Sequence, residues 1–186
     1  MKQLLEDIKT GQFRQAYLLY GQEAYLRNQY RDRLKAAMVQ EGDTMNFSSF
    51  QGKDINPAQI IDLAETMPFF ADRRVILIQD SGWFKKGGEA LADYLKTPSP
   101  TTFFIFAEAE ADKRNRLFKA VKEAGCAVEF STQDETTLKR WILGRIKKEN
   151  KAISRSGLEF FLQKTGSDME NIDRELEKLF CYTLKK

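Results

Sequence analysis

The sequence has 186 residues and contains no histidine. Without histidine, Ser-His and Cys-His catalytic groups are excluded, and so are the commonest zinc sites. There are only two cysteines, Cys126 and Cys181, and they lie in unrelated segments without the spacing of metal ligands. We therefore expect no metal site and no disulfide, but free buried thiols of the kind found in cytosolic proteins.

Long apolar runs are also missing. No run approaches the ~18–20 residues that cross a membrane. The N-terminal segment MKQLLEDIKT carries acidic residues where a signal peptide has an apolar stretch. We expect a cytoplasmic protein without a membrane partner.

Neither sign of charge is in large excess. The 30 basic and 27 acidic residues leave a net charge of +3, which does not suit a strongly basic DNA-binding tail. Basic residues gather in segments 27–35, 113–119 and 139–148, where we expect solvated helix faces. Contact of these helices with nucleic-acid phosphates or an acidic partner stays open as an alternative.

Short apolar runs alternate with amphipathic segments over the first 131 residues. Runs typical of strands occupy residues 16–21, 45–52, 73–80, 101–109 and 126–131. Helical patterns occupy residues 23–40, 56–66, 87–96 and 112–125, the second of them starting at Asn56-Pro57. This alternation predicts an α/β fold with a five-stranded parallel sheet and helices on both of its faces.

After Ser131 the pattern changes to three consecutive helices with no strand between them. We expect these helices over residues 132–150, 154–166 and 167–184. Two begin with Ser/Thr-x-x-Glu capping patterns and the middle one ends at a glycine: Thr132 with Glu135, Ser167 with Glu170, and Gly166. The sequence predicts an α/β domain over residues 1–135 and a small helical domain over residues 136–186.

The first strand runs into a helix at the place where a nucleotide-binding P-loop would lie. That loop needs G-x-x-x-x-G-K-S/T, because main-chain amides hold the phosphates, the lysine neutralises them and the hydroxyl holds magnesium. The segment here reads GQEAYLRNQ, with the single glycine Gly21 and no Lys-Ser/Thr. Glu23 stands where phosphate would come and would repel a triphosphate. We expect no ATP and no other cofactor.

Acidic residues after two of the strands offer no convincing catalytic site. Asp80 follows an apolar strand as a magnesium-binding acid would, but Ser81 stands where an ATPase has a water-activating glutamate. We expect a structural role for Asp80, with a divergent ATPase as the alternative. Glu108 and Glu110 are expected in a solvated loop rather than as a general acid/base pair.

Four segments together resemble the delta-subunit family of the bacterial DNA polymerase III clamp loader. They are AYLLYGQEAYL (16–26), RRVILIQD (73–80), TTFFIFAEAEADKRNRLFKAV (101–121) and GSDMENIDRELEKL (166–179). The resemblance implies an AAA+-like fold of the P-loop NTPase type that has lost ATP binding, followed by a three-helix lid domain. It implies a component of a DNA-directed DNA polymerase (nucleotidyltransferase) holoenzyme without a catalytic site of its own. Family members continue into a collar domain, so it also implies an N-terminal fragment without that domain.

The segment ETMPFFADRR (65–74) joins an expected helix to the next strand. From its pattern alone, packing of the two phenylalanines beneath the sheet is favoured. The resemblance instead implies a sliding-clamp-binding element here, commonly a Ser-Leu-Phe-like triplet, from which this sequence departs by proline for serine and phenylalanine for leucine. The expected clamp contacts are Met67, Pro68, Phe69, Phe70 and Arg73.

The resemblance also implies the partners. These are the sliding clamp (beta subunit) and, mainly through the collar domain, other clamp-loader subunits, whereas contact with DNA is expected to be weak. The implied function is to open the clamp ring for loading onto DNA during replication. Opening requires a second contact besides the apolar element, for which Arg73, Arg74 and a nearby charged helix are candidates.

Overall fold

The computed structural model describes residues 1–183 and divides into two compact units, Met1–Ser131 and Thr132–Lys186. The expected boundary between residues 135 and 136 falls at the beginning of the first helix of the second unit. Within residues 1–183, no helix combines the length and the hydropathy that a bilayer crossing requires.

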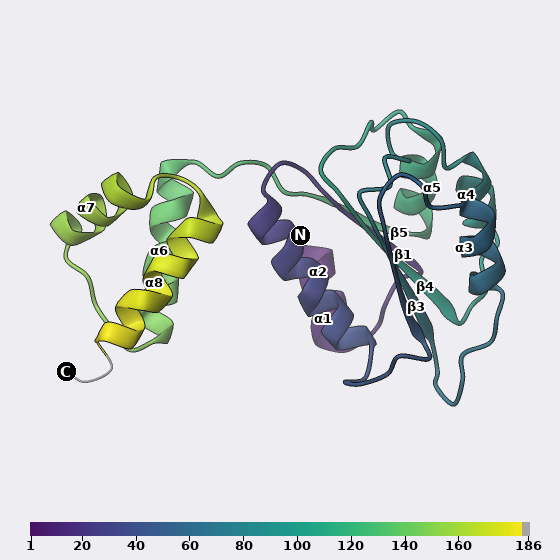
Figure 1. Ribbon diagram of the computed structural model, residues 1–186, viewed down its shortest axis with the longest axis horizontal. Helices are drawn as coiled ribbons and strands as arrows, with labels where there is room; N and C mark the ends of the chain where they lie inside the picture. Colours follow the sequence, from purple (N-terminus) through teal and green to yellow (C-terminus); the bar gives the residue numbers. More distant parts are fainter. Residues whose placement is uncertain (184–186) are drawn as a thin grey trace. The chain divides into compact units, whose positions relative to one another are not determined.

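The first unit is built on one parallel sheet of five strands (Figure 1). In chain order these are β1 (Ala16–Tyr20), β2 (Phe47–Gln51), β3 (Arg74–Gln79), β4 (Thr102–Glu108) and β5 (Gly125–Glu129). Their order across the sheet is β2-β3-β4-β1-β5, so β1 lies between β4 and β5. All five predicted strands are confirmed, as is the predicted parallel α/β class.

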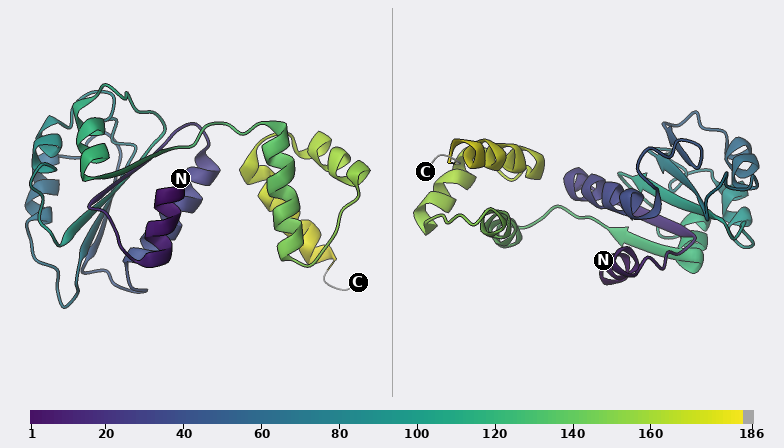
Figure 2. Two further views of the ribbon diagram at one scale, coloured as in Figure 1. Left: turned by 180° about the vertical axis from the view of Figure 1, so that it is seen from behind. Right: turned by 90° about the horizontal axis from the view of Figure 1, so that it is seen from below.

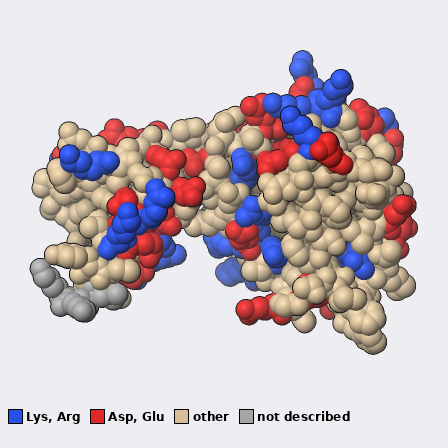
Figure 3. Space-filling model, in the orientation of Figure 1, with Lys and Arg blue, Asp and Glu red and all other residues tan. Residues whose placement is uncertain are grey.

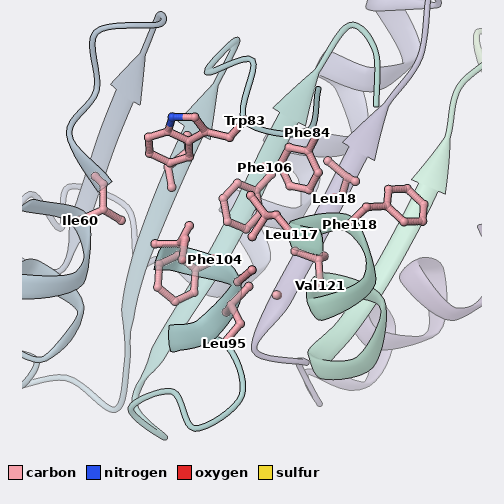
Figure 4. Close-up of a cluster of buried hydrophobic side chains, with 14 of the residues drawn as sticks. Leu18, Ile60, Trp83, Phe84, Leu95, Phe104, Phe106, Leu117, Phe118 and Val121 are labelled. Carbon is pink, nitrogen blue, oxygen red and sulfur yellow. The ribbon is translucent and has the colours of Figure 1, made fainter. Parts of the chain in front are cut away.

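Helices cover both faces of this sheet, as Figures 1 and 2 show. One face carries α1 (Lys2–Thr10) and α2 (Ala24–Met38), and the other carries α3 (Pro57–Ala64), α4 (Glu89–Tyr94) and α5 (Arg116–Ala124). Because successive side chains of a strand point to opposite faces, β1 contributes Tyr17 and Leu19 to the core beneath α1 and α2. Leu18 joins Phe104 and Phe106 in the other core, which Figure 4 shows.

Helix α1 was not predicted from the sequence. Only Leu4 and Asp7 are buried in it, and the carboxylate of Asp7 accepts a 2.8 Å hydrogen bond from the Tyr17 hydroxyl of β1. The predicted start of α3 is confirmed, since the Asn56 side chain accepts from the Ala58 N–H and Pro57 is the first helical residue.

The second unit contains α6 (Glu135–Lys148), α7 (Arg155–Thr165) and α8 (Met169–Tyr182), which confirms the three predicted helices. Their N-caps were predicted at the wrong residues. Asp134 and Asp168, rather than Thr132 and Ser167, accept the main-chain N–H three residues further on. Each aspartate lies immediately before the first helical residue, so its carboxylate reaches the free N–H groups of the first turn. The predicted Thr132 and Ser167 lie further from the helix. The predicted end of α7 at Gly166 is confirmed.

Candidate partner-binding loop

The connection between α3 and β3 carries an exposed apolar group at residues 67–70. The exposed fraction is 83% for Met67, 56% for Phe69 and 95% for Phe70. In Figure 3 the lower right surface of the α/β unit, over this connection, is largely uncharged. An apolar group of this size, left in contact with water, is typical of an interaction site. Packing beneath the sheet, which the sequence pattern alone favoured, is therefore wrong for both phenylalanines.

The main chain at Phe69 is held by the buried side chain of Asn46, which lies just before β2. The Phe69 N–H donates to Asn46 Oδ1 at 2.6 Å, and Asn46 Nδ2 donates to the Phe69 carbonyl at 2.9 Å. Asn46 is in turn oriented by Asp43, whose Oδ2 accepts from Asn46 Nδ2 and whose Oδ1 accepts from the Asn46 N–H, both at 2.9 Å. These hydrogen bonds from Asn46 lower the pKa of Asp43 below its ordinary value.

A second buried side chain holds the residues just before Phe69. The guanidinium of Arg74 donates to the carbonyl oxygens of Thr66 at 3.3 Å, Met67 at 3.2 Å and Met45 at 3.2 Å. The guanidinium of Arg74 is therefore occupied by acceptors within the same unit and cannot serve as the second contact with a partner. The sequence did not reveal this role, because its three acceptors are main-chain atoms.

Phe70 has an unusual backbone conformation. Its φ is 48°, in the left-handed region that bulky residues seldom adopt. Its ring contacts that of Phe69 edge to face, with 4.6 Å between centroids and 82° between planes. Such strain occurs where surrounding structure imposes it, and it is frequent at binding sites.

The other two expected contact residues are less accessible. Pro68 and Arg73 are both half-buried. The Arg73 guanidinium lies over the rings of Phe13 and Phe103, at 5.1 and 5.6 Å from their centroids. Together with Phe70, Arg73 lines a groove of about 470 Å³ between this connection and the C-terminal end of α2.

The β1–α2 connection, where a P-loop would lie, has its main chain engaged by neighbouring strands. The Gly21 N–H donates to the Glu108 carbonyl at 3.1 Å, and the Glu23 N–H donates to the Phe130 carbonyl at 3.0 Å. A Cβ on Gly21 would lie 2.2 Å from the Phe130 carbonyl oxygen. These two amides are thus not available to phosphate. That the chain binds no ATP stays a prediction.

Glu108 is not in a solvated loop, and that prediction is wrong. Its buried carboxylate accepts hydrogen bonds from the Ser81 N–H at 2.9 Å, the Ser81 hydroxyl at 2.5 Å and the Gly82 N–H at 3.2 Å. Burial raises the pKa of Glu108. This carboxylate fixes the turn after β3, because a buried polar group must find partners there.

Asp80 and Glu110, the other two acidic residues considered as candidate catalytic groups, are exposed. Asp80 accepts a 3.1 Å hydrogen bond from Gln51, and Glu110 forms an ion pair with Lys85. Among residues 1–183, no group of three cysteine and acidic side chains is placed to hold a metal ion. Neither cysteine is fully buried: Cys126 is half-buried and Cys181 is exposed, and both are free thiols.

Comparisons with known proteins agree with this architecture. Residues 17–131 match the family model described as DNA polymerase III, delta subunit. DNA polymerase III subunit delta of Bacillus subtilis is 27% identical over 189 residues, which cover 95% of this chain and 54% of that protein. The probable subunit delta of Aquifex aeolicus is 25% identical over 182 residues, covering 91% and 51%. The chain thus spans about half the length of these curated relatives.

Solved structures give the same picture. The DNA clamp loader delta protein of Bacillus subtilis has a TM-score of 0.76 at 25% identity, covering 100% of this chain and 58% of that one. A RuvB protein of Thermotoga maritima has a TM-score of 0.53 at 14% identity, covering 92% and 56%, a likeness of fold alone. The fold is thus AAA+-like. Because the family model matches well over half of the residues, the chain belongs to the DNA polymerase III delta subunit family.

Proposed function

We propose that this chain binds the sliding clamp through Met67, Phe69 and Phe70 and helps to open one interface of the ring. It would act as a non-catalytic subunit of the clamp loader. The observation that carries this proposal is the exposure of two adjacent phenylalanines on a main chain fixed from within by buried side chains. Membership of the delta family supports the choice of partner.

The exposed rings supply enough free energy for an interface anchor. Complete burial of a phenylalanine side chain stabilises a complex by roughly 1.5–3 kcal/mol. Phe70 is almost fully exposed and has that whole gain available, whereas Phe69 is 56% exposed and has about half of it. The pair therefore provides about 2–4 kcal/mol of gross binding free energy, in the range of a central aromatic hot spot.

Ring opening needs more than an anchor. A contact that is equally favourable to the open and the closed clamp shifts nothing between them, however tight it is. A second contact must therefore distinguish the two forms. Since Arg74 is buried, we assign this contact to Arg73, which lines the groove next to Phe70, or to a nearby charged helix.

The two structural units have separate roles in this proposal. Unit Met1–Ser131 is the AAA+-like domain that presents the clamp-binding loop, and the three-helix unit is the lid domain. Contacts with other loader subunits would be made mainly through the collar domain. This chain would not bind ATP, and it would bind DNA only weakly.

The test is titration of this protein against purified sliding clamp. The double variant Phe69→Ala/Phe70→Ala should bind about 30- to 900-fold more weakly, since it removes about 2–4 kcal/mol of burial free energy. The matched control is Phe160→Ala on α7, which removes another exposed phenylalanine, with an exposed fraction of 60%. It should bind like the unaltered protein. Undiminished binding by a folded double variant would refute the proposal, and ATP should not alter either titration.

A further inference from the structure

We propose that Asn46 and Arg74 are positioning residues that set the conformation of the 66–70 main chain for the clamp before it binds. This inference rests on the proposed function. Neither residue needs to touch the partner, because both are buried in the α/β unit. Their action would pass entirely through the main chain that carries Met67, Phe69 and Phe70.

The side-chain amide of Asn46 forms three hydrogen bonds, two with the main chain of Phe69 and one with Asp43. One Nδ2 hydrogen goes to the Phe69 carbonyl and the other to Asp43, while Oδ1 receives the Phe69 N–H. Asn46 therefore binds both main-chain polar groups of one residue, as a neighbouring strand would. Rotation of the Phe69 peptide units is opposed at both ends.

Arg74 completes the restraint on the preceding residues. It binds the carbonyls of Thr66 and Met67, and the next residue, Pro68, has its φ fixed by its own ring. From residue 66 to residue 69, each residue is thus restrained by a buried side chain or by a ring. The Thr66 and Met67 carbonyls thus face Arg74, and both main-chain polar groups of Phe69 face Asn46. The side chains of Met67 and Phe69 are exposed.

This restraint affects affinity because a loop that is ordered before binding loses less conformational entropy when it binds. A released loop would sample many conformations, of which only some present both rings. It would also be able to bury the exposed ring of Phe70 against Met38 and Val39, which line the same groove. In either case the observed affinity falls in proportion to the binding-competent fraction.

The decisive variant is Asn46→Ala, titrated against purified sliding clamp. We expect about a tenfold loss of affinity from losing both hydrogen bonds to Phe69. The matched control is Asn115→Ala, since Asn115 also caps and bridges main-chain groups of the same unit, at Leu117 and Trp83, but far from this loop in sequence. It should lower stability and leave clamp affinity unchanged.

Two readouts separate positioning from general stability. The Phe69 N–H should exchange with solvent faster in Asn46→Ala than in Asn115→Ala at equal global stability. In the Phe69→Ala/Phe70→Ala background, Asn46→Ala should cause almost no further loss of affinity, because residues that act together are not additive. If Asn46→Ala folds poorly, the double variant Asp43→Asn/Asn46→Asp exchanges the amide and the carboxylate, so that a donor still lies between the two side chains. It keeps an acceptor for the Phe69 N–H and removes the donor to the Phe69 carbonyl, so affinity should still fall.

The outcomes are distinct. If the Phe69→Ala/Phe70→Ala protein binds normally, the proposed function itself fails. If that protein binds weakly but Asn46→Ala and Asp43→Asn/Asn46→Asp bind normally, the positioning inference alone is overturned. It is equally overturned if Asn46→Ala loses the same factor with and without the two rings, or if Asn115→Ala weakens binding as much.

Discussion

Replacement of Gly21 by alanine tests whether the β1–α2 connection is closed by packing. Gly21 has φ of 126°, a conformation nearly confined to glycine. An added Cβ would lie 2.2, 2.7 and 2.9 Å from the carbonyl oxygen, the carbonyl carbon and the nitrogen of Phe130. Because all three are main-chain atoms, no side-chain rotation relieves the overlap. The chain that follows β5 would have to move.

The expected cost has two parts. The backbone conformation itself costs about 1–3 kcal/mol for a residue with a Cβ. Moving Phe130 also disturbs its 2.7 Å hydrogen bond to the Tyr20 carbonyl and the 3.0 Å hydrogen bond from the Glu23 N–H, each worth roughly 0.5–1.5 kcal/mol. We expect Gly21→Ala to lower the free energy of unfolding of the α/β unit by about 2–6 kcal/mol.

Urea denaturation measures this loss. The chain has two tryptophans, so a Trp141→Phe background leaves only Trp83. Its tryptophan fluorescence then reports on the α/β unit, in which Trp83 is buried. The matched control is Gly11→Ala, which also has positive φ, 72°, but no atom within 4 Å of an added Cβ. It should cost only about 1–2 kcal/mol for the left-handed conformation. If Gly21→Ala destabilised the unit no more than Gly11→Ala, packing against Phe130 would not explain the closed connection.

Two further predictions concern buried and exposed carboxylates. Glu108→Ala should lower the free energy of unfolding by about 2–3 kcal/mol, because it leaves donors of residues 81–82 buried without an acceptor; a urea titration showing no loss would contradict this role. Asp43 has a folded-state pKa below its ordinary value of 3.8, mainly through Asn46 and in small part through the charge of Arg74. Its stabilising contribution is therefore present above that value and is lost as pH falls through the folded pKa. The stability difference between the unaltered protein and Asp43→Asn should shrink below about pH 4, whereas a constant difference down to about pH 3 would exclude this linkage.

Much of the fold could be predicted because it depends on local pattern. The run Val75–Ile78 is apolar and β-branched or leucine at every position, which is typical of a strand buried on both faces. Asn56-Pro57 and Gly166 mark helix ends through their own backbone preferences. Helix α1 lacked such signals, since its attachment to β1 depends on the contact between Asp7 and Tyr17.

The candidate site divides in the same way. The resemblance located the apolar residues Phe69 and Phe70, but the sequence pattern alone favoured their burial. The main chain of Phe69 is held by hydrogen bonds to Asn46, 23 residues away in the chain. The pattern of apolar residues within one segment cannot predict a hydrogen bond between two distant segments. The role of Glu108 was missed for the same reason, because its partner Ser81 is 27 residues away.

By itself, the sequence determined that this chain has no histidine chemistry, that its P-loop pattern is broken at Gly21, and that five parallel strands precede three helices. Only the tertiary structure decided which polar groups meet. In the folded chain, the main chain of Phe130 occupies the space beside Gly21. Asn46 and Arg74 lie beneath the main chain of residues 66–69. The reason is that strand and helix preferences act over a few neighbouring residues, whereas a buried donor finds its acceptor only when distant segments pack together.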